Sequence, residues 1–331
     1  MKAVILDEHG STDGFKLAEI PTPIVLPGHV ILKVCASSVN PVDCKIRNGM
    51  LAGIGPELPG VLHGDVAGII SEVGEGVEGF EVGDEVYGCV GGFKGIPGVL
   101  SEYALADSRL LSKKPFSLSM KEAAVLPLVG ITAWNALIDR GQLSEGQKVL
   151  VHAGAGGVGH IALQLAKAMG VEVHTTISSP VKEGLALQMG ADQAINYSQI
   201  TPEQYVQEFA EGIGYDLVFD TVGGICLDQS FEAAKEYGTV VSIAARSTHD
   251  LTHVHVKSLS LHVVFMLLPI LKNQLRDKHG EILSKISSLV EDGKIHPLLH
   301  EETFSFEDVG QAHQCWEAGG VMGKISLENT W

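Results

Sequence analysis

Short runs of alternating hydrophobic and polar positions fill the first third of the chain. The segments HVILKVCASSV (residues 29–39) and VAGIISEVG (residues 66–74) have the composition of strands bounded by Gly or Pro. GFEVGDEVYGCV (residues 79–90) continues the pattern with two Gly turns. We therefore predict an antiparallel, partly barrelled β domain in this part of the chain.

The pattern changes at Lys121, where KEAAVLPLVGITAWNALID has helical spacing interrupted by Pro127 and so predicts two helical pieces. Strand and helix signals then alternate, which predicts parallel βαβ units and a doubly wound (Rossmann) sheet. The predicted strands cover residues 148–152, 171–176, 193–196, 216–220 and 239–244, and the helices between them cover residues 157–169, 181–189, 203–211 and 227–237. Residues 258–267 could add a sixth strand.

The C-terminal part no longer shows this alternation of strand and helix signals, and it could return to the first domain. We predict a helix at residues 280–291, a strand near 298–304, a helix near 306–318 and a final strand, GKISLE, at 323–328. The expected organisation is a β-rich domain of residues 1–121 and 268–331, with a dinucleotide-binding domain of residues 122–267. The most apolar stretch, LHVVFMLLPILK (residues 261–272), is shorter than the roughly 20 residues that span a bilayer, so we interpret it as a buried strand followed by a helix.

Composition and charge narrow the class of protein. Apolar residues make up 45% of the 331 residues, which argues against a disordered chain. The net charge of −17 argues against DNA or RNA as the main partner, because phosphate backbones require a basic surface. None of the five cysteines belongs to a C-x-x-C pair, and the start of the chain, MKAVILDEH, lacks the apolar run of a signal peptide. We therefore expect a cytoplasmic protein with reduced thiols that is not bound to a membrane.

A glycine-rich turn in VHAGAGGVGHIALQLAKAMG (residues 151–170) carries the first candidate chemistry. It follows a buried-type strand, precedes a helix and has the spacing G-x-G-x-x-G. Small residues let the backbone approach a pyrophosphate, which the amide N–H groups at the helix start would bind. The expected cofactor-binding residues of this turn are Gly154, Gly156, Gly157, Val158 and Gly159. A purely structural turn is the alternative.

The end of the second predicted strand indicates which dinucleotide is bound. Enzymes that use NAD usually carry Asp or Glu there to bind the ribose 2′-hydroxyl. This chain has Ser178, Ser179 and Lys182 instead, which suits a 2′-phosphate and favours NADPH. Lys182 could equally be a solvated helix residue, and Glu183 lies a turn into the helix, where it is a poor ribose ligand.

Several motifs together resemble the medium-chain dehydrogenase/reductase superfamily, and within it the zinc-independent quinone oxidoreductase (zeta-crystallin-like) branch. They are SSVNPVDCKIRNG (37–49), GDVAGIISEVGEGVEGFEVGDEVYG (64–88), LPLVGITAW (126–134), HAGAGGVG (152–159), MGADQAINY (189–197), FDTVGG (219–224) and GKISLE (323–328). The resemblance covers nearly the whole chain. It implies an α/β protein with a Rossmann domain and a GroES-like, partly barrelled catalytic domain.

The resemblance also assigns expected roles to residues. Asn40 and Asp43 stand in an N-P-x-D motif, with Asn40 near the nicotinamide ribose, and Thr132 is expected near the nicotinamide. Tyr197 would contact the adenosine ribose or its 2′-phosphate. The residues expected to line the nicotinamide half are Thr221, Val222, Ser242 and Ile243. As alternatives, Asn40 and Asp43 could cap a turn and a helix, and Tyr197 could be a packing residue.

Zinc is not expected. The zinc alcohol dehydrogenases of the superfamily bind zinc through Cys, His and Glu, whereas this chain has Asn40 at the Cys position and HGD in place of the G-H-E motif, so that Gly64 replaces the His. The four-Cys structural lobe is absent from the sequence. Cys44 and His63 as substitute ligands are the alternative. His63, where the family usually has Gly, could narrow the mouth of the active site or contact substrate.

These observations predict a zinc-independent, NADPH-dependent oxidoreductase that transfers hydride to quinones or α,β-unsaturated carbonyls. The cofactor performs the hydride chemistry and the protein orients the two reactants, in a cleft expected between the domains. No residue is assigned as the proton donor, and Tyr87 and Tyr103 are candidates by residue type alone. The segments expected at the substrate, residues 50–58, 93–100 and 265–268, are mainly apolar and favour a small hydrophobic substrate.

The resemblance further implies a homodimer formed through the last strand of the cofactor domain, LSLHVVFML (residues 259–267). A strand buried within the monomer is the alternative for this segment. Two other functions stay open. One is a zinc-type alcohol dehydrogenase, and the other is a non-catalytic NADPH-binding or sensor protein.

Overall fold

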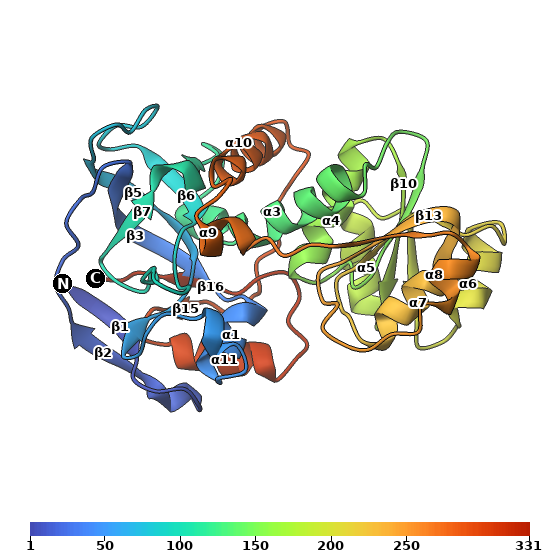
Figure 1. Cartoon of the computed structure of the whole chain (residues 1–331), viewed down its shortest axis with the longest axis horizontal. Helices are drawn as coiled ribbons and strands as arrows, with labels where there is room; N and C mark the ends of the chain where they lie inside the picture. The colour runs from blue at the N-terminus through green and yellow to red at the C-terminus, as the bar shows by residue number, and fades with distance from the viewer. The chain divides into compact units, whose positions relative to one another are not determined.

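The computed structural model describes residues 1–331, and the chain divides into two compact units. The first unit consists of Met1–Leu128, Leu267–Gly293 and Pro297–Trp331, so both ends of the chain contribute to it (Figure 1). The second unit consists of Val129–Met266 and Lys294–His296. None of the helices is long and apolar enough to cross a membrane.

The first unit is built on two mainly antiparallel sheets. The larger has the order β15-β16-β3-β5-β6-β8, with β7 also paired to β3. Its strands are β3 (His29–Ser38), β5 (Asp65–Val73), β6 (Glu85–Cys89), β7 (Tyr103–Asp107), β8 (Leu111–Lys113), β15 (Phe304–Ser305) and β16 (Ser326–Glu328). The smaller sheet contains β2 (Phe15–Glu19), β1 (Lys2–Leu6) and β4 (Gly60–Val61). Because β16 pairs with β3, with Leu327 opposite Ser37, the C-terminal segment completes a sheet that the N-terminal segment begins.

Helices cover this β-rich unit. They are α1 (Pro41–Arg47), α2 (Met120–Ala124), α9 (Leu268–Lys272), α10 (Asp277–Glu291) and α11 (Val309–Glu317), with 3-10 turns at Thr12–Gly14, Ala52–Ile54 and Ser108–Leu110. The apolar positions of α10 recur at helical spacing, and Ile282, Leu283 and Ile286 are buried. Tyr87 of β6 donates its hydroxyl to the carbonyl oxygen of Leu283 at 2.7 Å, which joins this helix to the sheet.

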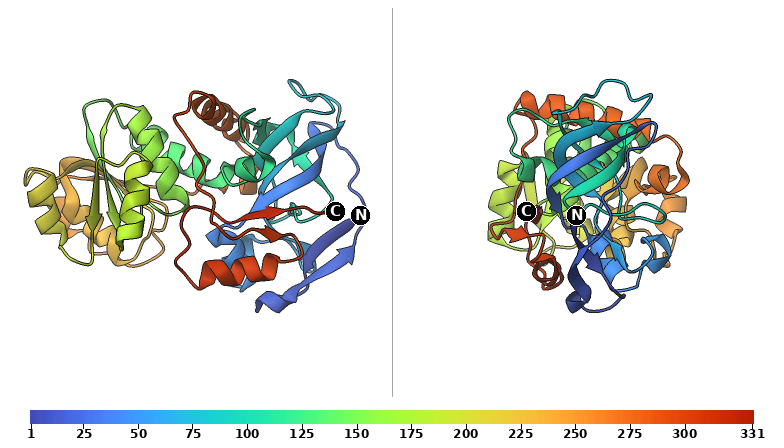
Figure 2. Two further views of the ribbon diagram at one scale, coloured as in Figure 1. Left: turned by 180° about the vertical axis from the view of Figure 1, so that it is seen from behind. Right: turned by 90° about the vertical axis from the view of Figure 1, so that its left-hand side faces the viewer.

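The second unit contains one parallel sheet with helices on both faces (Figure 2). Its order is β11-β10-β9-β12-β13-β14, from strands β9 (Lys148–Val151), β10 (Glu172–Ile177), β11 (Gln193–Asn196), β12 (Tyr215–Asp220), β13 (Ala234–Ser242) and β14 (Ser260–Val263). The helices are α3 (Pro127–Trp134), which continues as a π-helical turn (Asn135–Arg140), α4 (Gly157–Ala168), α5 (Pro180–Gln188), α6 (Pro202–Phe209), α7 (Ile225–Ala233) and α8 (Thr252–Val256). The strand order reverses between β9 and β12, and in such sheets ligands bind at the carboxyl ends of the strands at that point.

The predicted fold class, a Rossmann sheet with a separate β-rich domain, is confirmed, but three local predictions are wrong. The helix expected at residues 227–237 ends at Ala233, because Ala234 already has extended backbone and begins β13. The strand expected at 298–304 is reduced to an isolated bridge, Leu299 to Lys324, and the two-residue β15. The sixth strand exists as β14, but it is the exposed edge of the sheet and not a buried strand.

Candidate functional site

The glycine-rich turn connects β9 to α4, and close packing requires glycine at two of its positions. A Cβ atom on Gly154 would lie 2.3 Å from Oγ1 of Thr175, and one on Gly159 would lie 2.2 Å from the carbonyl oxygen of Ala153. Thr175 of β10 accepts the Gly154 N–H at 2.9 Å and donates its hydroxyl to Val151 at 2.6 Å, so the neighbouring strand fixes the turn. The backbone of the turn is therefore held close to the sheet.

The helix that follows offers unpaired amides. Gly156 is the N-cap of α4 and contributes no side-chain cap, and Gly157, Val158 and Gly159 form the first turn. The first amide N–H groups of a helix have no partner within the helix, and they carry the positive end of its dipole. The first turn contains no acidic residue. This combination suits an anionic ligand such as a pyrophosphate.

The end of β10 presents hydroxyls and one ammonium group. Ser179 caps α5 by accepting the N–H of Lys182 at 3.4 Å, and Nζ of Lys182 donates to Oγ of Ser178 at 3.1 Å. Glu183, in the first turn of α5, is exposed. Tyr197 follows the neighbouring strand β11 and is 55% exposed, so it is not a core packing residue. The set is cationic and rich in hydrogen-bond donors.

The ends of β12 and β13 are organised by Asp220, a buried carboxylate that the sequence analysis did not single out. It accepts the N–H groups of Val222 and Gly223 at 2.9 and 2.8 Å and the hydroxyl of Ser242 at 2.6 Å. Ser242 is therefore engaged with the protein, whereas Val222 is exposed. Thr221 donates its hydroxyl to the carbonyl oxygen of His152 at 2.7 Å and so ties β12 to β9.

Two further residues expected near the nicotinamide also belong to the second unit. Ile243 follows β13 and is half-buried, and Thr132 lies on α3 and is buried. The sheet thus brings together the ends of β9, β10, β12 and β13, which carry most of the predicted cofactor residues.

Asn40 and Asp43 belong to the first unit, where they join a buried polar cluster. Nδ2 of Asn40 donates to Asp65 at 2.8 Å, and the backbone N–H of Asn40 donates to the carboxylate of Asp43 at 2.8 Å. Asp43 therefore caps α1. Lys324, which lies just before β16, donates its ammonium group to the carbonyl oxygen of Val39 at 2.6 Å and to Oδ1 of Asn40, and lies 3.9 Å from Asp65.

Burial controls the charges in this cluster. Burial raises the pKa of Asp43 to about 7, and it raises the pKa of Asp65, which the nearby Lys324 ammonium group opposes. Burial also lowers the pKa of Lys324, against the attraction of the two carboxyl groups. Lys324 and Asp65 were not predicted as site residues. The only sequence signal was a lysine between Gly323 and an apolar strand.

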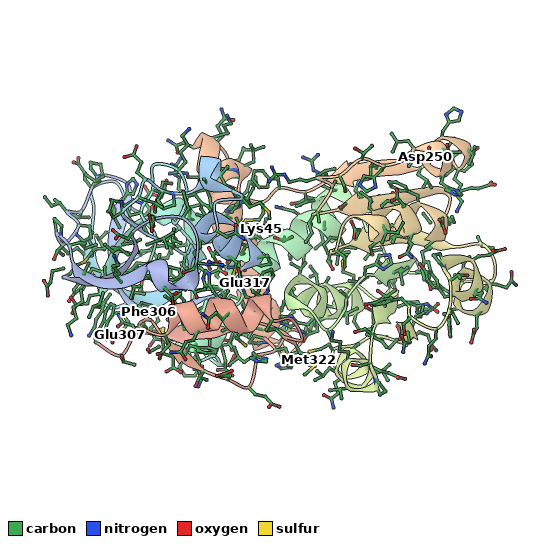
Figure 3. All side chains as sticks on the ribbon, turned by 90° about the horizontal axis from the view of Figure 1, so that it is seen from below. Lys45, Asp250, Phe306, Glu307, Glu317 and Met322 are labelled. Carbon is green, nitrogen blue, oxygen red and sulfur yellow. The ribbon has the colours of Figure 1, made fainter.

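His63 belongs to a second buried network. Its Nδ1 lies 3.0 Å from the carbonyl oxygen of Ser38, and its Nε2 lies 2.9 Å from Nε2 of His313. Nε of Arg47 donates to Nδ1 of His313 at 3.3 Å, and the same guanidinium binds Glu317 of α11. Glu317 and Lys45, a neighbour of Arg47 on α1, are both labelled in Figure 3.

The donors and acceptors of this network allow one assignment of protons. The Ser38 carbonyl oxygen can only accept, so Nδ1 of His63 carries a hydrogen. Arg47 can only donate, so Nδ1 of His313 accepts, and the Nε2–H of His313 donates to Nε2 of His63. Both rings are neutral, in agreement with burial, which lowers the pKa of His63 to about 3 and holds that of His313 well below its usual value. Both nitrogens of His63 are bonded inside the first unit, so the expectation that His63 contacts substrate is not supported.

The residues at the superfamily's catalytic zinc position do not fit zinc. A side chain at Gly64 would place its Cβ 2.5 Å from the carbonyl oxygen of Gly91, so a histidine there would require the backbone to shift. Asn40 already binds Asp65 and the ammonium group of Lys324, which would repel a divalent cation. Burial raises the pKa of the Cys44 thiol, and His63 has no free nitrogen, so these substitutes do not complete a ligand set.

The tyrosines proposed by residue type differ in position. Tyr87 is fully buried, its hydroxyl is bonded to Leu283, and burial raises its pKa. It is therefore a structural residue of the sheet and α10. Tyr103 lies half-buried on β7, opposite Lys33 of β3.

Comparisons with known proteins agree with this architecture. Residues 26–116 match the family described as alcohol dehydrogenase GroES-like domain, and residues 157–276 match the family described as zinc-binding dehydrogenase. The chain is 33% identical over 333 residues to the chloroplastic NADPH-dependent alkenal/one oxidoreductase of Arabidopsis thaliana, covering 98% of this chain and 78% of that protein.

Solved structures give the same result over the full length. An alcohol dehydrogenase superfamily protein from Novosphingobium aromaticivorans superposes with a TM-score of 0.95 at 39% identity, with 99% of both chains covered. The Escherichia coli quinone oxidoreductase complexed with NADPH gives a TM-score of 0.87 at 26% identity, covering 99% of this chain and 100% of that one. From its sequence motifs, its two-part architecture and these relatives, the chain belongs to the medium-chain dehydrogenase/reductase superfamily.

Proposed function

We propose that this protein is an NADPH-dependent reductase of quinones or α,β-unsaturated carbonyl compounds that works without catalytic zinc. The observation that carries the proposal is that a glycine-rich turn and the Lys182–Ser178 pair lie at the same edge of one sheet. Relatives named as an alkenal/one oxidoreductase and as a quinone oxidoreductase, both with NADPH in their names or structures, support the same chemistry.

The residues of the second unit would divide the cofactor between them. The amides of Gly157, Val158 and Gly159 bind the pyrophosphate. Lys182, with the hydroxyls of Ser178, Ser179 and Tyr197, binds the 2′-phosphate, because an ammonium group and neutral donors complement its charge. The nicotinamide half lies at the ends of β12 and β13, where Thr221, Val222, Ser242 and Ile243 stand, with Thr132 of α3. Bound there, NADPH supplies the hydride.

The residues at the zinc position of the first unit are compatible with conjugate reduction and with quinone reduction. Oxidation of an alcohol benefits from a Lewis acid that stabilises the alkoxide. Asn40, Gly64 and Lys324 do not provide zinc ligands, whereas transfer of hydride to an enone or a quinone spreads the negative charge over a conjugated system. Hydrogen-bond donors or water can then stabilise that charge. Asn40 is proposed to lie near the nicotinamide ribose, and its own orientation is fixed by Asp65 and Lys324.

The test is oxidation of NADPH followed against a panel of quinones and enones, with NADH as the control and with protein treated with a metal chelator. We expect turnover with NADPH, weaker turnover with NADH and no effect of the chelator. Activity that is lost on chelation and restored by zinc would favour the zinc-type alcohol dehydrogenase. Tight binding of NADPH without reduction of any acceptor would favour a non-catalytic sensor.

We also propose that the protein is a homodimer joined through β14. The strand is at the edge of the sheet, and Leu261, Val263 and Phe265 are 36%, 55% and 50% exposed. An exposed apolar edge strand has unpaired backbone groups that a second copy can pair with. Light scattering after size exclusion should give twice the chain mass, and Val263→Lys should give a monomer. A monomeric wild-type protein would contradict the proposal.

We further propose that the protein is cytoplasmic. All five cysteines are free thiols, as expected for a reducing compartment. Fractionation of the source cells, with the protein detected by antibody, should find it with cytoplasmic markers. Its recovery with an organelle or membrane fraction would refute this placement.

A further inference from the structure

Three metal-ligating side chains meet in the C-terminal part of the first unit, away from the cluster around Asn40. They are His300, Glu302 and Cys315, whose ligand atoms all lie within 4.8 Å of one another. Sγ of Cys315 is 3.6 Å from Nε2 of His300. His300 and Cys315 are half-buried and Glu302 is exposed. No role in the proposed reduction uses these residues.

Two of the three residues are held by ordered backbone. The N–H of His300 donates to the carbonyl oxygen of Lys324 at 2.8 Å, and the preceding residue, Leu299, forms a bridge with Lys324. Cys315 lies on α11, whose Val309 and Ala312 are buried. The thiol and the imidazole therefore approach each other from two separately anchored segments.

Their separation is that of ligands on one metal ion. With a Zn–S distance of about 2.3 Å, a Zn–N distance of about 2.0 Å and a roughly tetrahedral angle, the sulfur and nitrogen lie about 3.5 Å apart. The observed separation of 3.6 Å meets this requirement without movement of either backbone. Glu302 is exposed, so its side chain can rotate to bring a carboxylate oxygen to the third position.

The ligand chemistry selects the class of metal. A thiolate and an imidazole favour zinc and similar borderline ions, whereas magnesium and calcium prefer oxygen ligands alone. Three protein ligands leave a fourth tetrahedral position, which can hold water. We propose that His300, Glu302 and Cys315 form a zinc-binding site with one open position.

Such a site would act on the first unit as a cross-link. It would join the segment after Pro297 to α11, which also carries His313 and Glu317 of the buried network. A ligand that binds only the folded protein stabilises it in proportion to the logarithm of its concentration over its Kd. The proposed zinc therefore strengthens the return of the C-terminal segment to the first unit, and it takes no part in hydride transfer.

The direct test uses Co²⁺ as a spectroscopic probe on the full chain after removal of metals with a chelator. We expect about one equivalent of Co²⁺ to bind with the charge-transfer absorption of a thiolate–cobalt bond, and Zn²⁺ to displace it. Cys315→Ser should abolish this absorption. His300→Gln and Glu302→Gln should weaken binding by at least about tenfold. Cys35→Ser, which removes another half-buried free thiol of the same unit, is the matched control and should leave the spectrum unchanged.

The outcome does not depend on the proposed enzyme function. Zinc should raise the thermal unfolding midpoint of the wild-type protein and of Cys35→Ser but not that of Cys315→Ser, and Cys315→Ser should reduce quinones or enones at the wild-type rate. Absence of the thiolate–cobalt absorption in the wild-type protein, or its persistence in Cys315→Ser, would overturn the site. A cobalt-binding protein that reduces no acceptor would refute the reductase and leave the metal site supported.

Discussion

Mild acid should destabilise the first unit through the buried pair His63 and His313. Both rings are neutral in the folded protein, and burial lowers the pKa of His63 to about 3 and that of His313 well below its usual value. In the unfolded chain both rings titrate near pH 6.5. Above about pH 6.5 the two neutral rings therefore do not reduce the free energy of unfolding. As the pH falls from there toward the folded-state pKa, the free energy of unfolding decreases.

The size of this decrease follows from the difference between the pKa of a ring in the unfolded chain and its lower pKa in the folded protein. Each pH unit below about 6.5 stabilises the unfolded state by about 1.4 kcal/mol for each ring that stays neutral when folded. At pH 5 the loss is about 2 kcal/mol for His63, and His313 adds to the loss in the same direction. Other buried groups also titrate, and Asp43, whose pKa is raised to about 7, acts with the opposite sign. A difference between the wild-type protein and a single variant cancels their contributions.

His63→Asn is the variant that isolates one ring. Asn tolerates the positive φ of 68° at this position, and its amide can donate to the Ser38 carbonyl oxygen that His63 now binds. Urea unfolding, followed by tryptophan fluorescence, should be measured at about pH 7.5 and pH 5. Between these values the variant should lose about 2 kcal/mol less of its free energy of unfolding than the wild-type protein loses.

The control is His9→Asn, which removes a histidine that is exposed in the folded protein. Its ring stays in water in both states, so the pH dependence should match that of the wild-type protein. An equal decline for His63→Asn and wild type would mean that His63 takes up a proton in the folded state. The assignment of one neutral hydrogen-bond chain from Arg47 to Ser38 would then be wrong.

Three further predictions test the two units separately. Gly159→Ala should lower the free energy of unfolding by about 1–3 kcal/mol, because its Cβ would lie 2.2 Å from the Ala153 carbonyl oxygen. The same substitution should raise the Kd for NADPH in a fluorescence titration. An unchanged Kd would refute the turn as a phosphate site. Lys182→Glu should raise the KM for NADPH by at least about tenfold and the KM for NADH far less, whereas equal effects in steady-state assays would mean that the ammonium group only faces water. Lys324→Met should lower the free energy of unfolding, measured with urea, by about 3–5 kcal/mol, because Asp65 is left buried without its cation. Asp65→Asn in the same chain should recover part of this loss. No recovery would show that the two charges do not interact.

The sheet of the second unit was predictable because its signal is local. Each strand and helix occupies one short run of sequence, so the alternation in residues 148–244 is visible without knowledge of distant contacts. The glycine turn was predictable for the same reason, since strand, turn and helix follow one another directly. Prediction from local sequence fails at the edge of the sheet. The apolar run at β14 has the composition of a buried strand, yet Val263 is 55% exposed. Burial of an edge strand depends on a partner, and composition alone does not reveal it.

The polar networks of the first unit were not predictable, because their members lie far apart in sequence. His63 and His313 are separated by 250 positions, and Lys324 and Asn40 by 284. His63 was noticed as a departure from a motif, but its hydrogen-bond donor on α11, His313, has no sequence signature. Pairs of this kind depend on the tertiary return of the C-terminal segment, which periodicity does not encode. The same holds for His300 and Cys315, whose spacing of 15 residues matches no short metal motif.

Buried ion pairs of this kind are poor sources of net stability, because removing two charges from water costs about as much as their attraction returns. Their effect is to select one arrangement of the chain over others. Both ion pairs described in these networks join an N-terminal element to a C-terminal one: Arg47 to Glu317 and Lys324 to Asp65. A C-terminal segment that docked in a shifted register would leave Asp65 and Lys324 buried without partners, which is far more costly than a shifted apolar contact. The networks therefore select one register for β16 against β3, and that register fixes Asn40 at the start of α1.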